Sequence, residues 1–260
     1  MPELAEVKIM SDFVNTIVVG RVFDEIRVSD AVKKRLPLDK PNDLKLFSIL
    51  SESRGKETLL VLSKKDRSYT VSLSMGMTGH WQVADQSDLP KHAHLSFIST
   101  DGQALCLVDP RRFARWKWSG WSATRGPCPL TDMEKFRLNI TTNLNLRAFD
   151  RSIAEILMDQ TYFNGIGNYL RAEVLYLANQ DPFEPARDAL RNNPFILDLC
   201  TTIPAEAYMI GGGQLKDWKS PFSVPSDGFH SWIKCYGKSD QSIDIKGRRL
   251  WYFSSQIKKK

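Results

Sequence analysis

Residues 164–170 read NGIGNYL, and the two glycines of this stretch mark a turn that leads into a helix. After the turn, YLRAEVLYLA places Leu170, Val174 and Leu177 on one face, which predicts an amphipathic helix. Asn168 begins that helix. An asparagine at such a position is either an ordinary N-cap or, with the neighbouring backbone N–H groups, a binding site for a phosphate.

Helical signals surround this turn. Ser152 and Glu155 form a capping box ahead of an apolar run, and Asp181-Pro182 stops the helix that follows the turn. Helical pattern then continues to about Met209. We therefore expect a helical domain over residues 133–210.

The first half of the chain has a different pattern. A helix is expected to start at Pro2, whose fixed φ suits a first helical position, and to end at Gly20 as a C-cap. Short segments between turns then predict β-strands in a sandwich or barrel: RVFDEIRVS, TLLVLSK, YTVSLSM, HLSFIS, ALCLVD and FARWKW. This domain covers residues 1–121. Residues 122–132, with one glycine and two prolines, are typical of a linker.

The composition excludes several classes of protein. No run approaches the roughly 20 apolar residues of a membrane span. The first twenty residues lack a basic start and contain three acids, which argues against a secretory signal. The four cysteines form no C-x-x-C pair, so a zinc site built on such pairs is excluded. Four free thiols in a reducing compartment are expected.

The net charge of +6 is concentrated at the C-terminal end. Residues 211–260 hold ten Lys or Arg and four Asp or Glu, whereas the other 210 residues hold 26 of each sign. Eight aromatic residues are interleaved with these charges. A basic, aromatic-rich segment is either a nucleic-acid contact or a solvated basic surface.

The chain opens MPELAE. If Met1 is removed, Pro2 presents a secondary amine at a helix N-terminus, where the macrodipole disfavours its protonated form. With a carboxylate beside it, that amine could attack a sugar aldehyde and form a Schiff base. The alternative is an ordinary helix start with acids in its first turn.

Five motifs occur in one order between residues 2 and 170: Pro2-Glu3, Arg54-Gly55-Lys56, Gly76-Met77-Thr78-Gly79, the DPRRF of residues 109–113, and the stretch at 164–170. In this the sequence resembles the formamidopyrimidine-DNA glycosylase and endonuclease VIII family, and it is most similar to vertebrate-type Nei-like members whose C-terminal finger has lost its zinc. The resemblance implies an α+β fold. Its parts are an N-terminal helix with a two-layered antiparallel β-sandwich, a helical domain with a helix–two-turn–helix motif, and a zincless finger β-hairpin within residues 211–260.

The resemblance implies a bifunctional DNA glycosylase of base-excision repair that removes oxidised pyrimidines or formamidopyrimidines. Pro2 would attack C1′ of the deoxyribose, Glu3 would protonate the ring oxygen, and the Schiff base would collapse by β- and then δ-elimination. Lys56 would steady the phosphate near the lesion. No metal and no diffusible cofactor are expected. The expected partner is damaged DNA, duplex or with bubble or single-stranded character, bound by a monomer without membrane contact.

Other residues are implied to bind DNA. Asn168 matches a phosphate-binding asparagine, and Arg248 matches an arginine of the finger hairpin that enters the minor-groove side. Met77, Arg111 and Phe113 match the wedge that fills the gap left by a flipped nucleotide. The alternatives are core positions for Met77 and Phe113, and a generic charged hairpin for Arg248.

Three further residues match positions near the flipped base: Glu6, Lys234 and Tyr236. The finger is expected to hold its shape by packing of residues such as Trp232 and Trp251.

The sequence departs from the family pattern at several positions. Ala114 replaces a glycine, Ser74 stands where relatives often have His or Arg, and the loop around residues 211–214 offers no clear basic residue. These departures leave the substrate preference open.

Two alternatives belong to other functional classes. A non-catalytic DNA-binding protein would keep this scaffold without the chemistry, although the intact Pro2, Glu3 and Lys56 argue against it. An RNA-binding protein using the helix–two-turn–helix would need no N-terminal amine. For a DNA repair enzyme, a nuclear location is expected in a eukaryote and a cytoplasmic one otherwise, without secretion.

Overall fold

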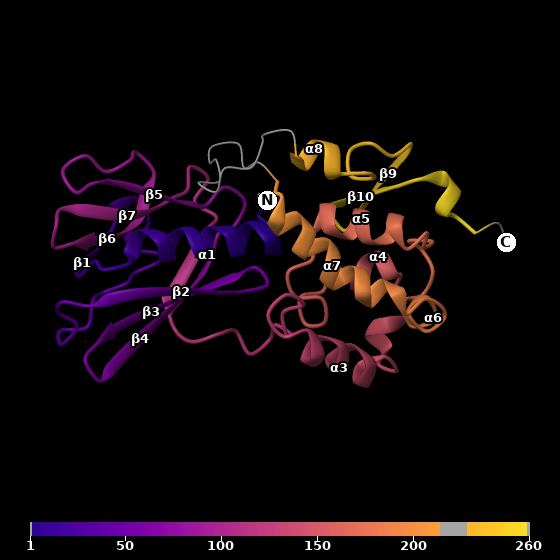
Figure 1. The fold of residues 1–260 in the computed structure, drawn as a ribbon, viewed down its shortest axis with the longest axis horizontal. Helices are drawn as coiled ribbons and strands as arrows, with labels where there is room; N and C mark the ends of the chain where they lie inside the picture. Colours follow the sequence, from indigo (N-terminus) through magenta and orange to yellow (C-terminus); the bar gives the residue numbers. More distant parts are fainter. Residues whose placement is uncertain (1, 214–227, 259–260) are drawn as a thin grey trace. The chain divides into compact units, whose positions relative to one another are not determined.

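The computed structural model describes residues 2–213 and 228–258. The chain divides into two compact units, coloured along the sequence in Figure 1. The first unit contains Pro2 and Glu6–Trp121. The second contains Glu3–Ala5, Ser122–Gly213 and the described residues from 228 onward. Part of the expected basic, aromatic stretch and Gln214 of the glycine-rich loop lie outside the described residues.

Helix α1 spans Leu4–Val18, so it begins two residues later than the sequence indicates. Pro2 and Glu3 precede it in non-helical conformation. The backbone N–H of Leu4 donates to the carbonyl of Gly165 at 3.1 Å, which holds this end of the chain against the turn at residues 164–168. Gly20 ends the helix as expected, with a left-handed φ of 72°.

Two four-stranded antiparallel sheets form the first unit (Figure 1). Their strand orders are β1-β6-β7-β5 and β2-β3-β4-β8. The elements of this unit after α1 are β1 (Phe23–Val28), α2 (Asp30–Lys33), β2 (Ser48–Arg54), β3 (Glu57–Lys64), β4 (Arg67–Ser74), β5 (His80–Asp85), β6 (Ala93–Ser99), β7 (Gln103–Val108) and β8 (Arg115–Trp118).

One hydrophobic cluster joins the two sheets and α1. Met10 and Val14 enter it from α1, Leu60 from β3, and Trp81 and Phe97 from the other sheet. All five side chains are fully buried. This shared core confirms the expected two-layered antiparallel sandwich with an N-terminal helix.

Two of the eight strands escaped the sequence analysis. Strand β2 reads SILSESR and buries Ile49 and Ser51 between exposed Ser48, Leu50 and Glu52. Strand β5 reads HWQVAD and has only six residues. Strand β2 has two apolar residues in seven and β5 has three in six, and pairing with β3 and with β7 supplies the order that their composition does not predict.

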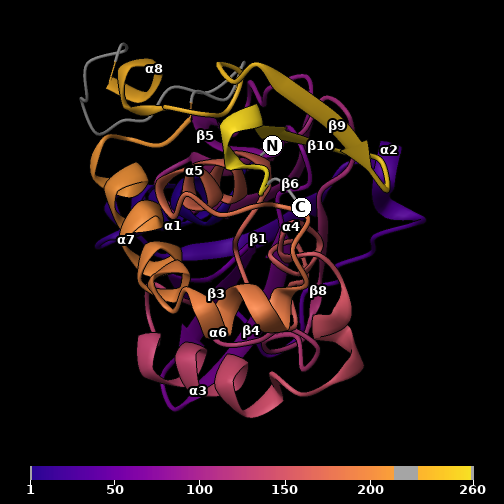
Figure 2. The ribbon, with the colours of Figure 1, turned by 90° about the vertical axis from the view of Figure 1, so that its right-hand side faces the viewer.

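The second unit is helical (Figure 2). Its helices are α3 (Met133–Asn143), α4 (Ile153–Ile156), α5 (Asn168–Leu177), α6 (Ala186–Asn192), α7 (Phe195–Met209) and α8 (Gly228–Trp232), with short 3-10 turns at Arg147–Asp150 and Ser254–Gln256. The core gathers side chains from α3, α4, α5 and α7, together with Leu4 and Ala5.

Helix α5 ends before the expected stop at Asp181-Pro182. Its last residue is Leu177, and Asn179 takes a left-handed φ of 46°. The N–H of Gln180 then donates to the carbonyl of Leu175 at 3.0 Å, which closes the helix end. At α4, the side chain of Ser152 accepts from the N–H of Glu155, as the capping signal indicates.

A β-hairpin follows α8. Strand β9 (Gln241–Ile245) pairs antiparallel with β10 (Arg248–Tyr252). Lys246 and Gly247 join them with φ of 50° and 75°, the left-handed pair of a tight two-residue turn. The hairpin predicted for the end of the chain is confirmed.

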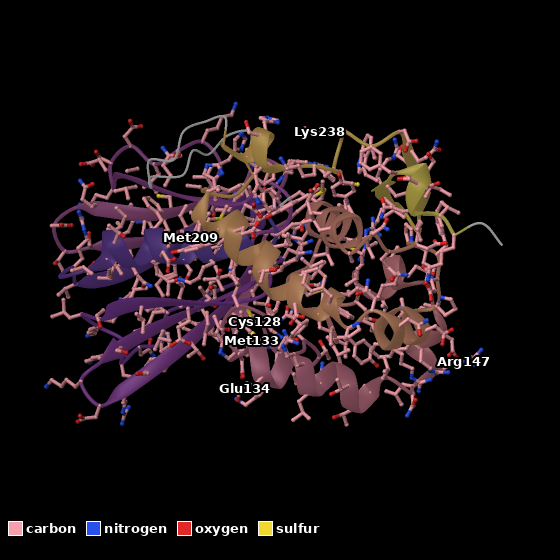
Figure 3. All side chains as sticks on the ribbon, turned by 45° about the vertical axis from the view of Figure 1, so that its right-hand side comes forward. Cys128, Met133, Glu134, Arg147, Met209 and Lys238 are labelled. Carbon is pink, nitrogen blue, oxygen red and sulfur yellow. The ribbon has the colours of Figure 1, made fainter. Side chains whose placement is uncertain are left out.

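All four cysteines are buried and free, as expected, and Cys128 is labelled in Figure 3. Of the helices that the structure describes, none combines the length and apolarity needed to cross a bilayer.

Candidate functional site

Glu3 is a buried carboxylate in the second unit, with 4% of its surface exposed. Its Oε1 accepts from the backbone N–H of Tyr169 at 3.0 Å, and its Oε2 from the N–H of Leu170 at 3.3 Å. Both donors lie in the first turn of α5, where N–H groups have no partner inside the helix. A carboxylate at a helix N-terminus is stabilised by these donors and by the macrodipole.

The glycines of the NGIGNYL stretch make room for this carboxylate. A Cβ on Gly167 would lie 2.2 Å from Cδ of Glu3, and a Cβ on Gly165 would lie 2.4 Å from Cδ1 of Leu4. Gly165 also has a φ of 108°, which favours glycine. The turn that predicts a helix start is therefore also the surface on which residues 3 and 4 rest.

Asn168 is the first residue of α5, and Gly167 occupies the N-cap position. The ordinary N-cap interpretation of Asn168 is therefore wrong. Its Oδ1 accepts from Nη2 of Arg171 at 3.3 Å.

Arg171 is a fully buried guanidinium that sequence analysis did not single out. Burial lowers its pKa to about 10, and the charge of Glu3 opposes that shift. Besides Asn168, it donates to the carbonyl of Ala154 in α4 at 3.1 Å and to that of Arg249 in β10 at 2.9 Å. One side chain thus ties Asn168 and the hairpin to the same helix.

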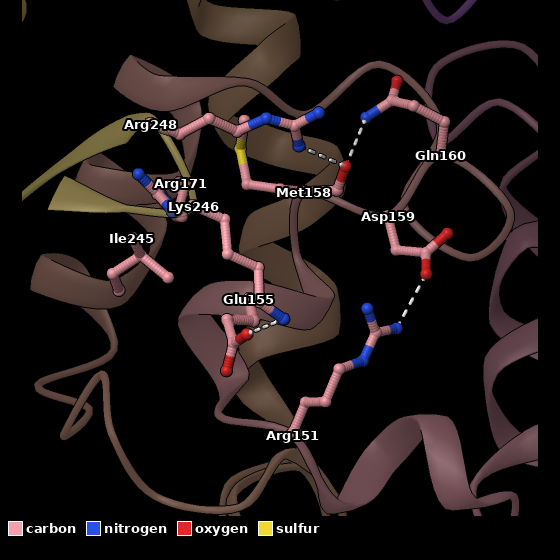
Figure 4. Close-up of a pocket in the computed structure, with 9 residues that line it drawn as sticks. All are labelled: Arg151, Glu155, Met158, Asp159, Gln160, Arg171, Ile245, Lys246 and Arg248. Atoms are coloured by element: carbon pink, nitrogen blue, oxygen red, sulfur yellow. Dashed lines mark hydrogen bonds and ion pairs between the residues drawn. The ribbon is translucent and has the colours of Figure 1, made fainter.

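A pocket of about 390 Å³ lies beside the turn of the hairpin (Figure 4). Lys246 pairs with Glu155 of α4 at 2.7 Å, and this hydrogen bond lowers the pKa of Glu155. Arg248 donates to the carbonyl of Met158 at 3.3 Å. The turn that carries Arg248 is therefore anchored to the residues around α4.

Glu173 holds the segment between α8 and the hairpin. Its carboxylate is 2% exposed and accepts three backbone N–H bonds, from Lys234 at 2.8 Å, Cys235 at 2.9 Å and Tyr236 at 2.7 Å. Three consecutive donors on one carboxylate fix the backbone of this segment on α5.

The same segment carries the two predicted finger residues. Lys234 is exposed, and Tyr236 is half-buried with its ring 6.3 Å from that of Tyr169 and 6.1 Å from that of Trp251. Burial raises the pKa of Tyr236, and the negative charge of Glu3 adds to the effect. Trp232 also contacts Tyr169, at 6.4 Å between ring centroids. Trp232 and Trp251 thus pack as the sequence indicates.

The first unit holds Pro2, Glu6 and Lys56. Pro2 and Glu6 are both buried, Pro2 ahead of α1 and Glu6 in its first turn. Lys56 is half-buried in the two-residue turn between β2 and β3, where Gly55 takes a φ of 58°. Arg54 and Glu57 flank this turn and form an ion pair at 3.3 Å.

Met77, Arg111 and Phe113 lie on two neighbouring loops of the first unit. Met77 is 37% exposed and Phe113 42% exposed, so neither is a core residue. The guanidinium of Arg111 stacks over the ring of Phe113 at 4.7 Å. A Cβ on Gly76 would lie 2.7 Å from the backbone of Phe113, which shows how closely the two loops approach.

Asp109 organises these loops, and sequence analysis assigned it no role. It is 1% exposed. Its carboxylate accepts from the hydroxyl of Thr78, from the N–H of Arg111 at 3.3 Å and from the N–H of Ala114 at 2.7 Å. Polar residues enclosed by apolar stretches, such as the Arg and Glu of YLRAEVLYL and the Asp of LVDP, are the signal that could have identified Arg171, Glu173 and Asp109.

The second unit thus gathers Glu3, Asn168, Tyr236 and Arg248 around α5, and the first unit gathers Met77, Arg111 and Phe113. In the described ranges, no three His, Cys, Asp or Glu side chains are grouped as metal ligands would be.

Comparisons with known proteins show a family and a fold that this chain shares. Residues 1–116 match the profile described as the formamidopyrimidine-DNA glycosylase N-terminal domain. The chain is 36% identical to endonuclease 8-like 1 of Homo sapiens over 97% of this chain and 72% of that protein. It is 26% identical to the formamidopyrimidine-DNA glycosylase of Pseudoalteromonas atlantica over the whole of both chains. The structure resembles the MutM (Fpg) protein of Thermus thermophilus with a TM-score of 0.79, at 23% identity over 98% of each chain.

Proposed function

This chain belongs to the formamidopyrimidine-DNA glycosylase and endonuclease VIII family, and we propose that it performs the family's chemistry with Pro2 and Glu3. It is a DNA glycosylase with AP lyase activity that acts on oxidised bases in damaged DNA. The roles of the individual residues in that chemistry are what we propose.

The position of Glu3 is the observation that carries this assignment. Carboxylates are rarely buried unless they are partnered, and Glu3 has two N–H donors from α5. Gly165 and Gly167 leave the space that Glu3 and Leu4 fill. An ordinary chain end does not need its acid buried and fixed by N–H donors, whereas an acid that must be positioned beside a reacting sugar does.

The proposed reaction begins with the amine of Pro2, freed by removal of Met1. Its nitrogen bonds to C1′ as the glycosidic bond breaks, and the departing base takes the electron pair of that bond and a proton from water. Glu3 accepts the proton that the Pro2 nitrogen loses and delivers it to the ring oxygen, so that the opened sugar forms a Schiff base. Loss of a C2′ proton expels the 3′ phosphate, and a second elimination expels the 5′ phosphate. The N–H groups of Tyr169 and Leu170 hold the carboxyl group of Glu3 in its place at the start of α5.

We assign DNA contacts to both units. In the second unit Asn168 and Arg248 bind phosphate and groove, and their fixed positions relative to α5 support this. In the first unit Lys56 binds a phosphate near the lesion, and Met77, Arg111 and Phe113 fill the gap left by the flipped nucleotide. Their exposure supports that role.

Glu6, Lys234 and Tyr236 are assigned to the surroundings of the flipped base. The attachment of the 234–236 segment to α5 through Glu173 supports the last two. The protein is proposed to act in the compartment that holds the DNA, which is the nucleus in a eukaryotic host.

A gel assay with two substrates tests the division of labour between Pro2 and Glu3. Glu3→Gln should lose about 10²–10⁴-fold in excision of an oxidised base. It should keep much of its cleavage of a pre-formed abasic site, because there the base has already gone. Glu52→Gln, an exposed carboxylate of β2, is the matched control and should resemble the wild type. Equal loss of both activities in folded Glu3→Gln would overturn this division.

A further inference from the structure

The two exposed loops of the first unit share one buried anchor. The Met77 loop (residues 75–79) and the Phe113 loop (residues 109–114) meet at the carboxylate of Asp109. Thr78 of the first loop donates its hydroxyl to Oδ1. The N–H groups of Arg111 and Ala114 donate to Oδ1 and Oδ2.

We propose that Asp109 is a positioning residue that locks the Met77 loop and the Phe113 loop into one rigid wedge. This inference rests on the proposed function, in which Met77, Arg111 and Phe113 fill the hole left by a flipped nucleotide. Asp109 touches no DNA in this account. It acts by holding the side chains that do.

The burial of Asp109 shows why the lock is strong. The residue is 1% exposed, so its charge is stabilised by its donors rather than by water. The carboxylate also spans its own loop, because it accepts from the N–H groups of both Arg111 and Ala114. Arg112 lies between these two donors and takes a strained φ of 56°. The backbone N–H of Asp109 donates to the carbonyl of His92 at 2.9 Å, which fixes the anchor to the β6 side of the sheet.

The backbones of the two loops approach each other closely. Gly76, with a φ of 62°, lies so close to the Phe113 loop that a Cβ would come within 2.7 Å of the Phe113 backbone. The N–H of Gly79 donates to the carbonyl of Met75 at 3.0 Å and closes the Met77 loop on itself. The two loops therefore pack directly on each other, and we expect loss of the Asp109 contacts to let them move apart.

A wedge is needed only where a duplex has a hole to fill. A base excised from a single strand leaves no orphaned partner and no stack to support. The ratio of excision rates on duplex and single-stranded DNA that carry the same oxidised base therefore reports the wedge, and a general loss of folding or chemistry does not change that ratio.

The test compares Thr78→Val, Thr78→Ser and Asp109→Asn with the wild type in single-turnover excision. Asp109→Asn turns an NH₂ toward N–H donors, and Thr78→Val removes one donor but leaves the carboxylate. Both should lower duplex excision about tenfold and leave single-strand excision within about threefold. Thr78→Ser keeps the hydroxyl and should restore the wild-type ratio. The control is Asp85→Asn, because exposed Asp85 accepts from the N–H and the hydroxyl of Ser87 at a turn outside the wedge.

The outcomes separate the inference from the function on which it rests. An unchanged ratio in Thr78→Val, or equal losses on both substrates, would overturn the role of Asp109 as the lock. If Asp109→Asn does not fold, the contrast between Thr78→Val and Thr78→Ser decides alone. A wild-type protein that excises the base from neither substrate would instead overturn the proposed function.

Discussion

Gly167 and the carboxylate of Glu3 occupy adjoining space, since a Cβ built on Gly167 would lie 2.2 Å from Cδ of Glu3. Gly167 is the N-cap of α5, and its φ of −129° is open to any residue. The glycine is therefore required by the proximity of Glu3 and not by backbone strain.

Gly167→Ala should displace Glu3 and impair base excision. The new methyl group must push the carboxyl group away from the N–H groups of Tyr169 and Leu170, a strain of about 1–3 kcal/mol. We expect single-turnover excision of an oxidised base to fall at least about tenfold. Gly120→Ala is the control, because nothing lies within 4 Å of a Cβ there. Wild-type excision in Gly167→Ala would show that Glu3 need not occupy this place.

Glu173→Gln should weaken the attachment of residues 234–236 to α5. An amide offers one acceptor oxygen to three N–H donors and turns its own NH₂ toward the others. We expect the free energy of unfolding, measured in urea, to fall by about 1–3 kcal/mol. Glu206→Gln is the matched variant, since its amide oxygen can still accept from the indole N–H of Trp232. Equal stability of the two variants would contradict the anchoring role of Glu173.

Stability should fall at alkaline pH through Cys235. Burial raises the pKa of its thiol from 9.0 to about 12, with a further contribution from the charge of Glu173. Between these values the unfolded chain has lost the proton that the folded chain keeps. The free energy of unfolding therefore decreases as pH rises above 9, by at most about 1.4 kcal/mol per pH unit. Urea titrations from about pH 8 to pH 10 should show a flatter decline in Cys235→Ala than in the wild type. Identical slopes would refute this.

Salt dependence should separate phosphate contacts from the wedge. Arg248→Ala removes a positive charge from the proposed DNA contacts, so the slope of log K against log salt should flatten by about one unit. Asn168→Ala removes a neutral contact and should weaken binding at every salt concentration without changing the slope. Phe113→Ala removes no charge and should leave the slope unchanged while slowing base flipping. Fluorescence anisotropy on plain duplex DNA measures the slopes. A flattened slope in Phe113→Ala would show that the wedge assignment is mistaken.

Most of the fold follows from local sequence patterns. The α5 face of Leu170 and Val174 and the C-cap at Gly20 each carry a short-range signal that the structure bears out. Leu177, expected on the same face, is 44% exposed at the end of the helix. Strand β2 was not predicted because only two of its seven residues are apolar, and β5 was not predicted because it pairs with β7 and not with the strand that follows it along the chain. The start of α1 was misplaced for a related reason: the contacts of Glu3 and Leu4 with residues about 160 positions later set it.

The sequence motifs name the candidate site residues but not the residues that hold them in place. Pro2, Glu3 and Asn168 belong to motifs that can be read in order along the chain. Arg171 contacts the backbone of the hairpin, and Glu173 contacts the backbone of residues 234–236. No sequence spacing predicts such contacts. Asp109 was part of a recognised motif, yet its tie to Thr78 joins two loops that only the folded sheets bring together.

Borohydride trapping tests whether Pro2 supplies the nucleophile. The protein, with Met1 removed, is mixed with abasic DNA, and borohydride reduces the Schiff base that joins them. The covalent product is then digested and mapped by mass spectrometry. We predict one DNA adduct, on the peptide that begins at Pro2, and no adduct when the N-terminus is extended or acetylated. An adduct on Lys56, or trapping that persists in the blocked protein, would show that Pro2 is not the nucleophile.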